Sequence, residues 1–165
     1  MATIPNPRLH PHEYPNYLYR VHFPGVSHTF YSDAGGFECC AGGSIQICNY
    51  DHLAKELETH LNWYSNEPSY FISMFGTESL AINWARKKIE KGIAQDATLM
   101  VIDPDKIKNA YGNPIPILKV RDVIEQYPGL LPNGIKESWV RNEFLALYKI
   151  PARAISVLFL SVFSC

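Results

Sequence analysis

The sequence has 165 residues, of which 47% are hydrophobic, 13% aromatic and 19% charged, and its formal net charge is -1 at pH 7. This balance is that of a globular protein and excludes an intrinsically disordered chain. The length suits one domain that buries enough apolar surface to fold without crosslinks. The near-neutral charge excludes a broadly basic protein that binds nucleic acid or anionic membranes through its overall charge.

The N-terminal segment is rich in proline and has no apolar segment of the kind found in a secretory signal. We expect residues 1–16 to form an extended lead-in and residues 17–165 to form a single domain. His10 and His12 lie in the lead-in and are interpreted as surface residues, because no third metal ligand accompanies them. The expected location is the cytoplasm, or a host cell entered by a secreted effector if the sequence was trimmed.

Four cysteines, Cys39, Cys40, Cys48 and Cys165, lack the spacing of metal ligands. Adjacent cysteines form ordinary disulfides poorly, so we expect mostly free thiols in a reducing compartment. The alternative is a bridge from Cys39 or Cys40 to Cys48. Nothing in the sequence predicts a metal site.

The first strand is predicted over Tyr17–Phe23, where side chains alternate between two faces. Leu18, Arg20 and His22 share the less apolar face. An arginine there is normally solvated. If the face lines a cleft, however, the planar fork of a guanidinium suits a phosphate better than any other side chain.

Pro24–Gly43 is predicted to be irregular, with paired glycines that suit either plain turns or a loop lying against a ligand. Its glycines do not follow the GxGxxG spacing of a dinucleotide-binding Rossmann domain, which is therefore rejected. A helix is predicted over Asp51–Leu61, capped by the side chain of Asp51. Its histidines, His52 and His60, are interpreted as packing or surface groups.

A short strand over Tyr70–Phe75 carries Ser73 and is followed by a helix that Thr77 caps. A serine in a buried strand is normally satisfied by the backbone, and no GxSxG elbow marks this one as a nucleophile. We therefore expect Ser73 to hold another group in place. Another strand is predicted over Ala97–Ile102.

The last third of the chain contains a short strand over Leu118–Val120, a helix over Arg121–Tyr127 and a strand that runs from Glu143 to a break at Pro151. The apolar run 155–163 is too short to span a bilayer, which needs about 20 residues, and is predicted to be a buried final strand. A lone carboxylate at a strand entry is most often solvated. However, residues at the point where a loop enters a strand are also often catalytic or binding residues.

Three blocks of the sequence resemble the ADP-ribosyltransferase superfamily, in the branch of cholera toxin and heat-labile enterotoxin catalytic chains and their fungal relatives. The blocks span about 135 residues. LYRVHF contains Arg20 and is followed by Gly35 and Gly36 in GGF, and YFISMFGTESLAINWA resembles a Ser-Thr-Ser strand and helix with Ser73 as its first serine. EFLALYKIP begins at Glu143 and reaches Ile-Pro seven residues later, as the family's catalytic strand does.

The resemblance implies an α+β fold in which two facing, mainly antiparallel sheets surround an NAD cleft, with flanking helices. It also implies a catalytic set of Glu143, Ser73 and Arg20. Glu143 would stabilise the cationic sugar that forms when nicotinamide leaves NAD and would hold the ribose 2′-hydroxyl. Arg20 would bind a pyrophosphate oxygen or the adjacent ribose. Ser73 would orient Glu143 and support the nicotinamide ribose, and Gly35 and Gly36 would lie against the NAD.

Two departures from the family pattern bear on the substrate. Met74 and Phe75 replace the last two residues of Ser-Thr-Ser, and Phe75 is expected to form an apolar wall for nicotinamide. Arg141 stands two residues before the catalytic glutamate, where arginine-directed relatives have Glu, and its charge would repel a target guanidinium. Trp139 and Arg141 are the residues expected to recognise the acceptor.

The resemblance implies an enzyme that consumes NAD and passes ADP-ribose to a protein, a small molecule or water, with nucleic acid disfavoured by the charge and no membrane partner. One alternative is a module of the same fold that binds a nucleotide or a protein without turnover, because fold alone does not determine function. Another is an RNA phosphotransferase on the same scaffold, which would need a basic face. The sequence does not predict the acceptor or the oligomeric state.

Overall fold

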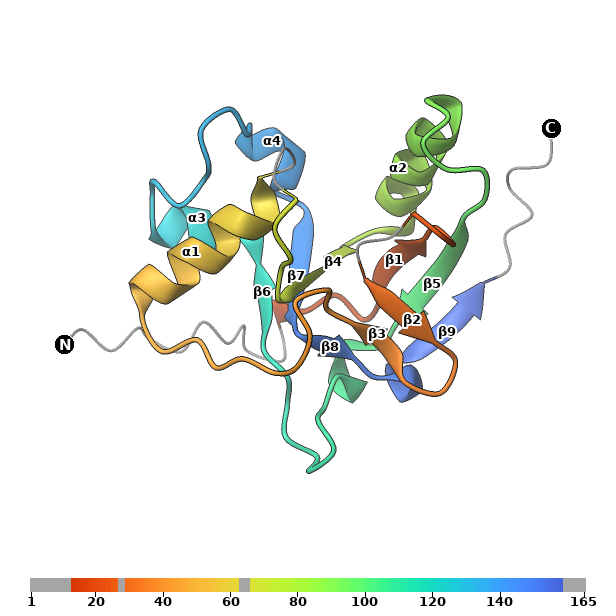
Figure 1. Cartoon of the computed structure of the whole chain (residues 1–165), viewed down its shortest axis with the longest axis horizontal. Helices are drawn as coiled ribbons and strands as arrows, with labels where there is room; N and C mark the ends of the chain where they lie inside the picture. The colour runs from red at the N-terminus through yellow and green to blue at the C-terminus, as the bar shows by residue number, and fades with distance from the viewer. Residues whose placement is uncertain (1–12, 27–28, 63–65, 159–165) are drawn as a thin grey trace.

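The computed structural model describes residues 13–26, 29–62 and 66–158 (Figure 1). The predictions for His10, His12, Cys165, most of the lead-in and the end of the final strand lie outside these residues. The described strands are β1 Leu18–His22, β2 Phe30–Ser32, β3 Gly36–Glu38, β4 Phe71–Phe75, β5 Thr98–Ile102, β6 Ile117–Lys119, β7 Glu143–Leu147, β8 Lys149–Ile150 and β9 Ile155–Leu158. The helices are α1 Tyr50–Leu61, α2 Glu78–Glu90, α3 Val120–Gln126 and α4 Glu137–Val140, with 3-10 turns η2 Pro104–Lys106 and η3 Ala152–Ala154.

The strands form two antiparallel sheets. The larger sheet has the order β6-β7-β4-β1-β5-β9 and the smaller one the order β2-β3-β8. Helices α1, α3 and α4 gather at one end of the molecule and α2 lies at the other, beside β1 and β4 (Figure 1). The α+β class with two mainly antiparallel sheets and flanking helices, predicted from the sequence, is confirmed.

Strand β1 has one face toward α2 and the other toward the small sheet. Val21 and Phe23 pack in a core with Ala81 and Ala85 of α2. On the other face, Leu18 is fully buried in the main core that also contains residues of β3, β4 and β7. The predicted alternation is therefore confirmed, and the face that carries Arg20 is covered by the small sheet.

Three predicted elements differ from the structure. Pro24–Gly43 is not wholly irregular, because β2 and β3 form a hairpin within it, too short to show a periodic pattern. Helix α1 is capped by Asn49, whose side chain accepts the His52 N–H at 2.9 Å, and not by Asp51. Strand β9 is an edge strand with Ser156 and Val157 exposed, so this part of the predicted final strand is not buried.

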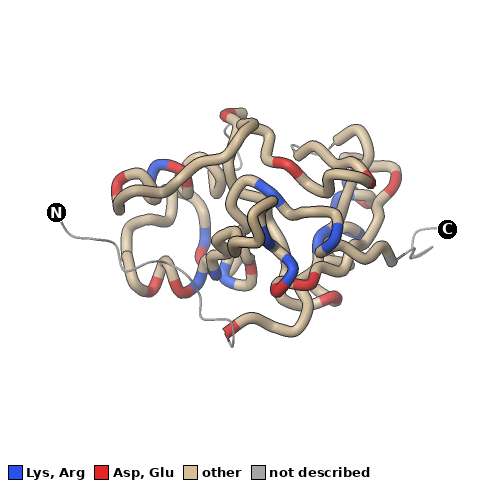
Figure 2. The backbone as a smooth tube through the Cα atoms, turned by 90° about the horizontal axis from the view of Figure 1, so that it is seen from below, with Lys and Arg blue, Asp and Glu red and all other residues tan. Residues whose placement is uncertain are grey.

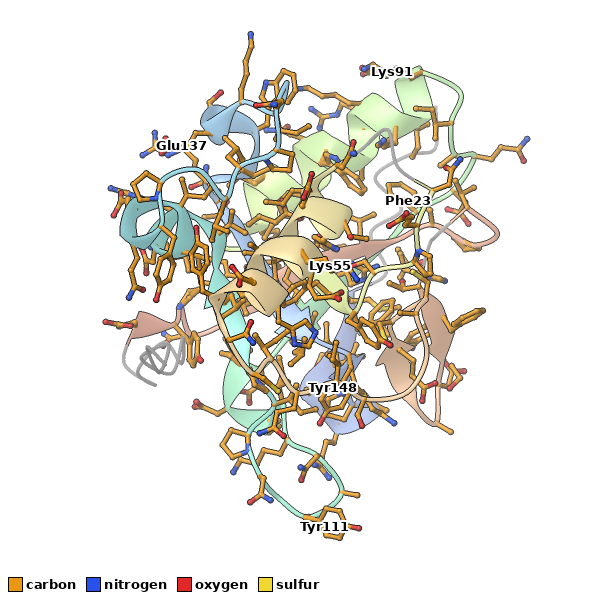
Figure 3. The ribbon with its side chains drawn as sticks, turned by 60° about the vertical axis from the view of Figure 1, so that its left-hand side comes forward. Phe23, Lys55, Lys91, Tyr111, Glu137 and Tyr148 are labelled. Carbon is orange, nitrogen blue, oxygen red and sulfur yellow. The ribbon has the colours of Figure 1, made fainter. Side chains whose placement is uncertain are left out.

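The strand that begins at Glu143 ends before Pro151, as predicted, but it is interrupted at Tyr148, where the chain leaves the large sheet for the small one (Figure 3). Tyr148 has a φ of 54°, a left-handed conformation that is uncommon for residues other than glycine. Its N–H donates to the Tyr70 carbonyl at 2.7 Å, and its carbonyl accepts the Cys39 N–H at 2.9 Å. These bonds join the two sheets at the end of β7.

Charged residues of both signs are interspersed over the described part of the molecule (Figure 2). This distribution agrees with the formal net charge of -1. Within the described ranges, no helix is long and apolar enough to cross a membrane.

Gly36 allows the small sheet to close against the chain after β8. Its φ is +79°, and a Cβ added there would lie 2.2 Å from the Ile150 carbonyl oxygen. We expect Gly36→Ala to lower the free energy of unfolding by about 3 kcal/mol, because the change combines backbone strain with a clash against the main chain. Urea unfolding measures the loss.

Gly92→Ala is the matched control, because Gly92 has a φ of +68° and no atom within 4 Å of an added Cβ. It is expected to cost only the backbone strain, about 1 kcal/mol. Equal losses in the two variants would contradict this account of Gly36.

Candidate functional site

Three neighbouring strands bring together the three predicted catalytic residues. Arg20 lies on β1, Ser73 on β4 and Glu143 at the first position of β7, and these strands are adjacent in the order β7-β4-β1 (Figure 1). Arg20 and Ser73 are 53 positions apart in the sequence, and Ser73 and Glu143 are 70 positions apart. Only the sheet topology makes them neighbours.

Ser73 and Glu143 share one face of the large sheet. The register pairs Ser73 with Leu145 and Phe75 with Glu143, so both side chains project from the same side. The Ser73 hydroxyl donates a hydrogen bond to Oε1 of Glu143. Glu143 is half-buried, which keeps its carboxylate partly accessible while its orientation is fixed.

His60 of α1 completes the cluster. Its Nε2 lies 2.7 Å from the Ser73 hydroxyl oxygen and 3.7 Å from Oε1 of Glu143, and its Nδ1 lies 2.8 Å from the Ser69 hydroxyl oxygen. Because the single hydroxyl proton of Ser73 is donated to the carboxylate, Nε2 of His60 must be the donor to Ser73. A neutral His60 therefore carries its proton on Nε2 and accepts at Nδ1 from Ser69.

Ser69 anchors this chain of hydrogen bonds. Its hydroxyl oxygen accepts the Phe71 N–H at 3.0 Å, which leaves its proton for His60. Its own N–H donates to Sγ of Cys40 at 3.2 Å, and its carbonyl accepts the Cys40 thiol at 3.6 Å. Ser69 is buried, so its position is fixed by both main chain and side chain.

Arg20 is held against the same strand. Its Nη1 donates to the Ser73 carbonyl at 2.6 Å, its Nη2 donates to Oγ1 of Thr29 at 2.7 Å, and its Cζ lies 4.7 Å from the centre of the Phe37 ring. Burial lowers the pKa of Arg20 to about 10, and the negative charge of Glu143 opposes this shift. The guanidinium therefore remains charged at neutral pH.

The other predicted site residues surround this cluster at different depths. Phe75 is half-buried directly across from Glu143, and its ring centre lies 5.7 Å from that of Trp84. Arg141 is exposed on the turn that leads into β7. Trp139 is also exposed, on α4, with Nζ of Lys136 5.5 Å from its ring centre.

Gly35 lies in the turn between β2 and β3, and Gly36 is the first residue of β3. The closest atoms to Gly36 belong to residues 150–152, and the closest to Gly35 belong to Ser32, not to Arg20, Ser73 or Glu143. Packing of the small sheet therefore explains these glycines without a ligand.

Sequence reasoning did not identify His60 or Ser69 as site residues. A signal for His60 existed, because it follows Leu57 by three positions and borders the buried stripe of α1. No signal existed for Ser69, since its role depends on the path of the chain before β4. The thiols of Cys39, Cys40 and Cys48 are free.

The cluster offers a fixed carboxylate, a cation and an imidazole side by side. A carboxylate beside a sugar ring stabilises developing positive charge, and a guanidinium binds phosphate oxygens. In the described ranges, no group of three or more His, Cys, Asp or Glu residues could hold a metal ion.

Comparison with known proteins gives one family. Residues 13–161 match the family described as Domain of unknown function (DUF7587). No curated protein is significantly similar to the chain.

The hydrogen-bond chain predicts the tautomer of His60. In nitrogen-detected NMR spectra recorded where the rings are neutral, we expect His60 to carry its proton on Nε2, because Ser69 donates to Nδ1. His52 on the same helix is the control, since its Nε2 lies 3.8 Å from Glu56 and it lacks this hydrogen-bond chain. A neutral His60 protonated on Nδ1 would show that the chain of hydrogen bonds runs differently.

Proposed function

We propose that this chain, which belongs to the DUF7587 family, is an ADP-ribosyltransferase or NAD glycohydrolase that releases nicotinamide from NAD. The observation that carries the proposal is the hydrogen-bonded cluster of Arg20, Ser73 and Glu143 on three adjacent strands. These are the residues on which the resemblance to the ADP-ribosyltransferase superfamily depends. The two antiparallel sheets are compatible with that fold, and we place the NAD cleft between them.

In the proposed reaction, the bond between C1′ of the ribose and the nicotinamide nitrogen breaks. Nicotinamide leaves with the bonding electron pair, and the ribose becomes a cation that Glu143 stabilises. A nucleophile on the acceptor, or water, then bonds to C1′ and loses a proton to solvent. NAD is consumed as a substrate, and no metal takes part.

The cluster suits these steps because Glu143 is oriented before the substrate arrives. The Ser73 hydroxyl donates to Oε1 of Glu143, so Oε2 is the oxygen that accepts from the ribose 2′-hydroxyl. His60 donates to Ser73 and so directs the hydroxyl proton toward the carboxylate. His60 thus acts as a positioning residue. Phe75, across from Glu143, supplies an apolar wall for nicotinamide.

The acceptor approaches past the turn that leads into β7. Arg141 and Trp139 are exposed there and are the residues that we assign to acceptor recognition. The charge of Arg141 disfavours an arginine acceptor, since two guanidinium groups repel each other. The acceptor is a protein side chain of another type, a small molecule or water.

Met74, one of the departures from the family pattern, is fully buried and faces away from Ser73. It therefore serves packing and does not touch the cluster.

A binding module without turnover is the second candidate. Both terminal nitrogens of Arg20 are already bonded to protein oxygens, which favours a structural role for this guanidinium. Calorimetry with NAD, combined with a nicotinamide-release assay, separates the candidates because a module binds without releasing nicotinamide.

We expect Glu143→Gln to reduce nicotinamide release from NAD by at least about 100-fold, because the amide cannot stabilise a sugar cation as a carboxylate does. The affinity for NAD should change little. Glu137→Gln on α4, at the surface (Figure 3), is the control and should leave release unchanged. Undiminished release by Glu143→Gln would remove Glu143 from this role.

A second prediction concerns His60. His60→Leu should lower kcat for nicotinamide release by about 10-fold, because Ser73 loses the donor that orients it. His60→Gln should retain most of the rate, since its amide N–H can replace Nε2–H. Unfolding curves show whether either variant is destabilised. Equal rates for the Leu and Gln variants would show that the hydrogen bond to Ser73 plays no part.

A further inference from the structure

Two buried side-chain nitrogens have no hydrogen-bond partner, Nε of Arg20 and Nδ1 of His22. Both belong to β1, two residues apart, so both side chains project from the same face of the strand. Buried polar atoms are nearly always paired, because an unmade hydrogen bond is costly. Two such atoms on one face of a strand therefore indicate a ligand that accepts hydrogen bonds.

Both side chains face the small sheet. The Phe37 ring of β3 lies beside each of them, 4.7 Å from Cζ of Arg20 and 5.8 Å from the His22 ring centre. Tyr31 of β2 lies 5.1 Å from the His22 ring centre, and Thr29, just before β2, binds Arg20. The unpaired nitrogens thus lie where the two sheets meet, in the region that we assign to NAD.

The surroundings of these nitrogens favour an anion. Burial and the positive charge of Arg20 lower the pKa of His22, so its ring is neutral at neutral pH when no anion lies beside it. Burial and the neighbouring Asp33 raise the pKa of Tyr31, whose phenol is neutral too. Phe37 of β3 is apolar, and Arg20 is the charged residue whose field acts on His22.

We infer that Nε of Arg20 and Nδ1 of His22 together bind the pyrophosphate of the dinucleotide, which makes His22 a second anion-binding residue of the site. The inference rests on the proposed function and adds a residue that the sequence resemblance does not include. A phosphate oxygen can accept from both nitrogens, and such charge-assisted hydrogen bonds are the strong ones.

Entry of the ligand requires β2 to move. Both nitrogens are buried under the segment that contains Thr29 and Tyr31. Strand β2 has three residues and lies at an edge of the small sheet, whereas β3 is paired on both sides and holds the buried Phe37. A shift of β2 therefore exposes the nitrogens while the core of the small sheet stays in place.

Binding should be linked to proton uptake. The phosphate charge favours a protonated His22, so the affinity for ADP-ribose should be higher at about pH 6 than at about pH 8. Arg20 stays charged across this range, and Tyr31 stays neutral. His60 and Glu143 lie nearby but are the same in every His22 variant, so the variants isolate the contribution of His22.

Calorimetry with ADP-ribose, which has the pyrophosphate but no scissile nicotinamide bond, tests the inference. His22→Phe keeps a ring against Tyr31 and Phe37 and should weaken binding about 10-fold, with loss of the proton uptake. His22→Asn offers an amide N–H near the position of Nδ1 and should retain most of the affinity without taking up a proton. Equal affinity of wild type and His22→Phe, or no binding of ADP-ribose by wild type, would overturn the inference.

The experiments distinguish a failure of the His22 subsite from a failure of the proposed enzyme activity. ADP-ribose binding that depends on His22, without any release of nicotinamide from NAD, would support the subsite and reject the enzyme. Release of nicotinamide that is abolished in Glu143→Gln, with ADP-ribose binding indifferent to His22, would support the enzyme and reject the subsite. Inorganic pyrophosphate in the same experiment shows whether the anion alone is sufficient, since its binding should weaken in His22→Phe by a similar factor.

Discussion

The candidate site depends on the hydrogen bonds of Ser73. Its hydroxyl joins Glu143 to His60, and its carbonyl binds the guanidinium of Arg20. One residue in the middle of β4 therefore links the outer two strands of the site to a helix. Without the bond from the Ser73 hydroxyl, the half-buried carboxylate of Glu143 would lose a partner. Without the bond to the Ser73 carbonyl, the guanidinium of Arg20 would lose one. A buried charge that loses a partner costs more than an ordinary hydrogen bond contributes.

This arrangement follows from how β1 meets β4. The two strands pair at Tyr19 and Phe75, whereas β1 pairs with β5 at five positions. Where the two strands are not paired, the Ser73 carbonyl accepts from a side chain instead of a neighbouring strand. The guanidinium thus satisfies the Ser73 carbonyl while it also feels the negative charge of Glu143, and Phe37 of the small sheet lies over it.

Much of the secondary structure could be predicted from local patterns. The alternation in β1, the Thr77 cap of α2 and the strand that begins at Glu143 all appear in the structure. The hairpin of β2 and β3 could not be predicted, because three-residue strands have no measurable period. The change of sheet at Tyr148 was missed as well, since it depends on hydrogen bonds to residues distant in sequence.

The site was predictable to a similar extent. The order of Arg20, Ser73 and Glu143 along the chain suggested a common location, and the structure places them on neighbouring strands. The sequence predicts only a packing or surface role for His60, because its partners Ser69 and Ser73 become its neighbours only when α1 packs on β4. Gly35 and Gly36 were assigned to cofactor binding, whereas contacts within the small sheet account for their conformation.

The most direct test of this account is a crystal structure of the Glu143→Gln variant with NAD. The account predicts the nicotinamide ribose against residue 143 and the pyrophosphate between the two sheets, on the face of β1 that carries Arg20. NAD bound at any other surface, or absent from crystals grown at saturating concentration, would contradict it.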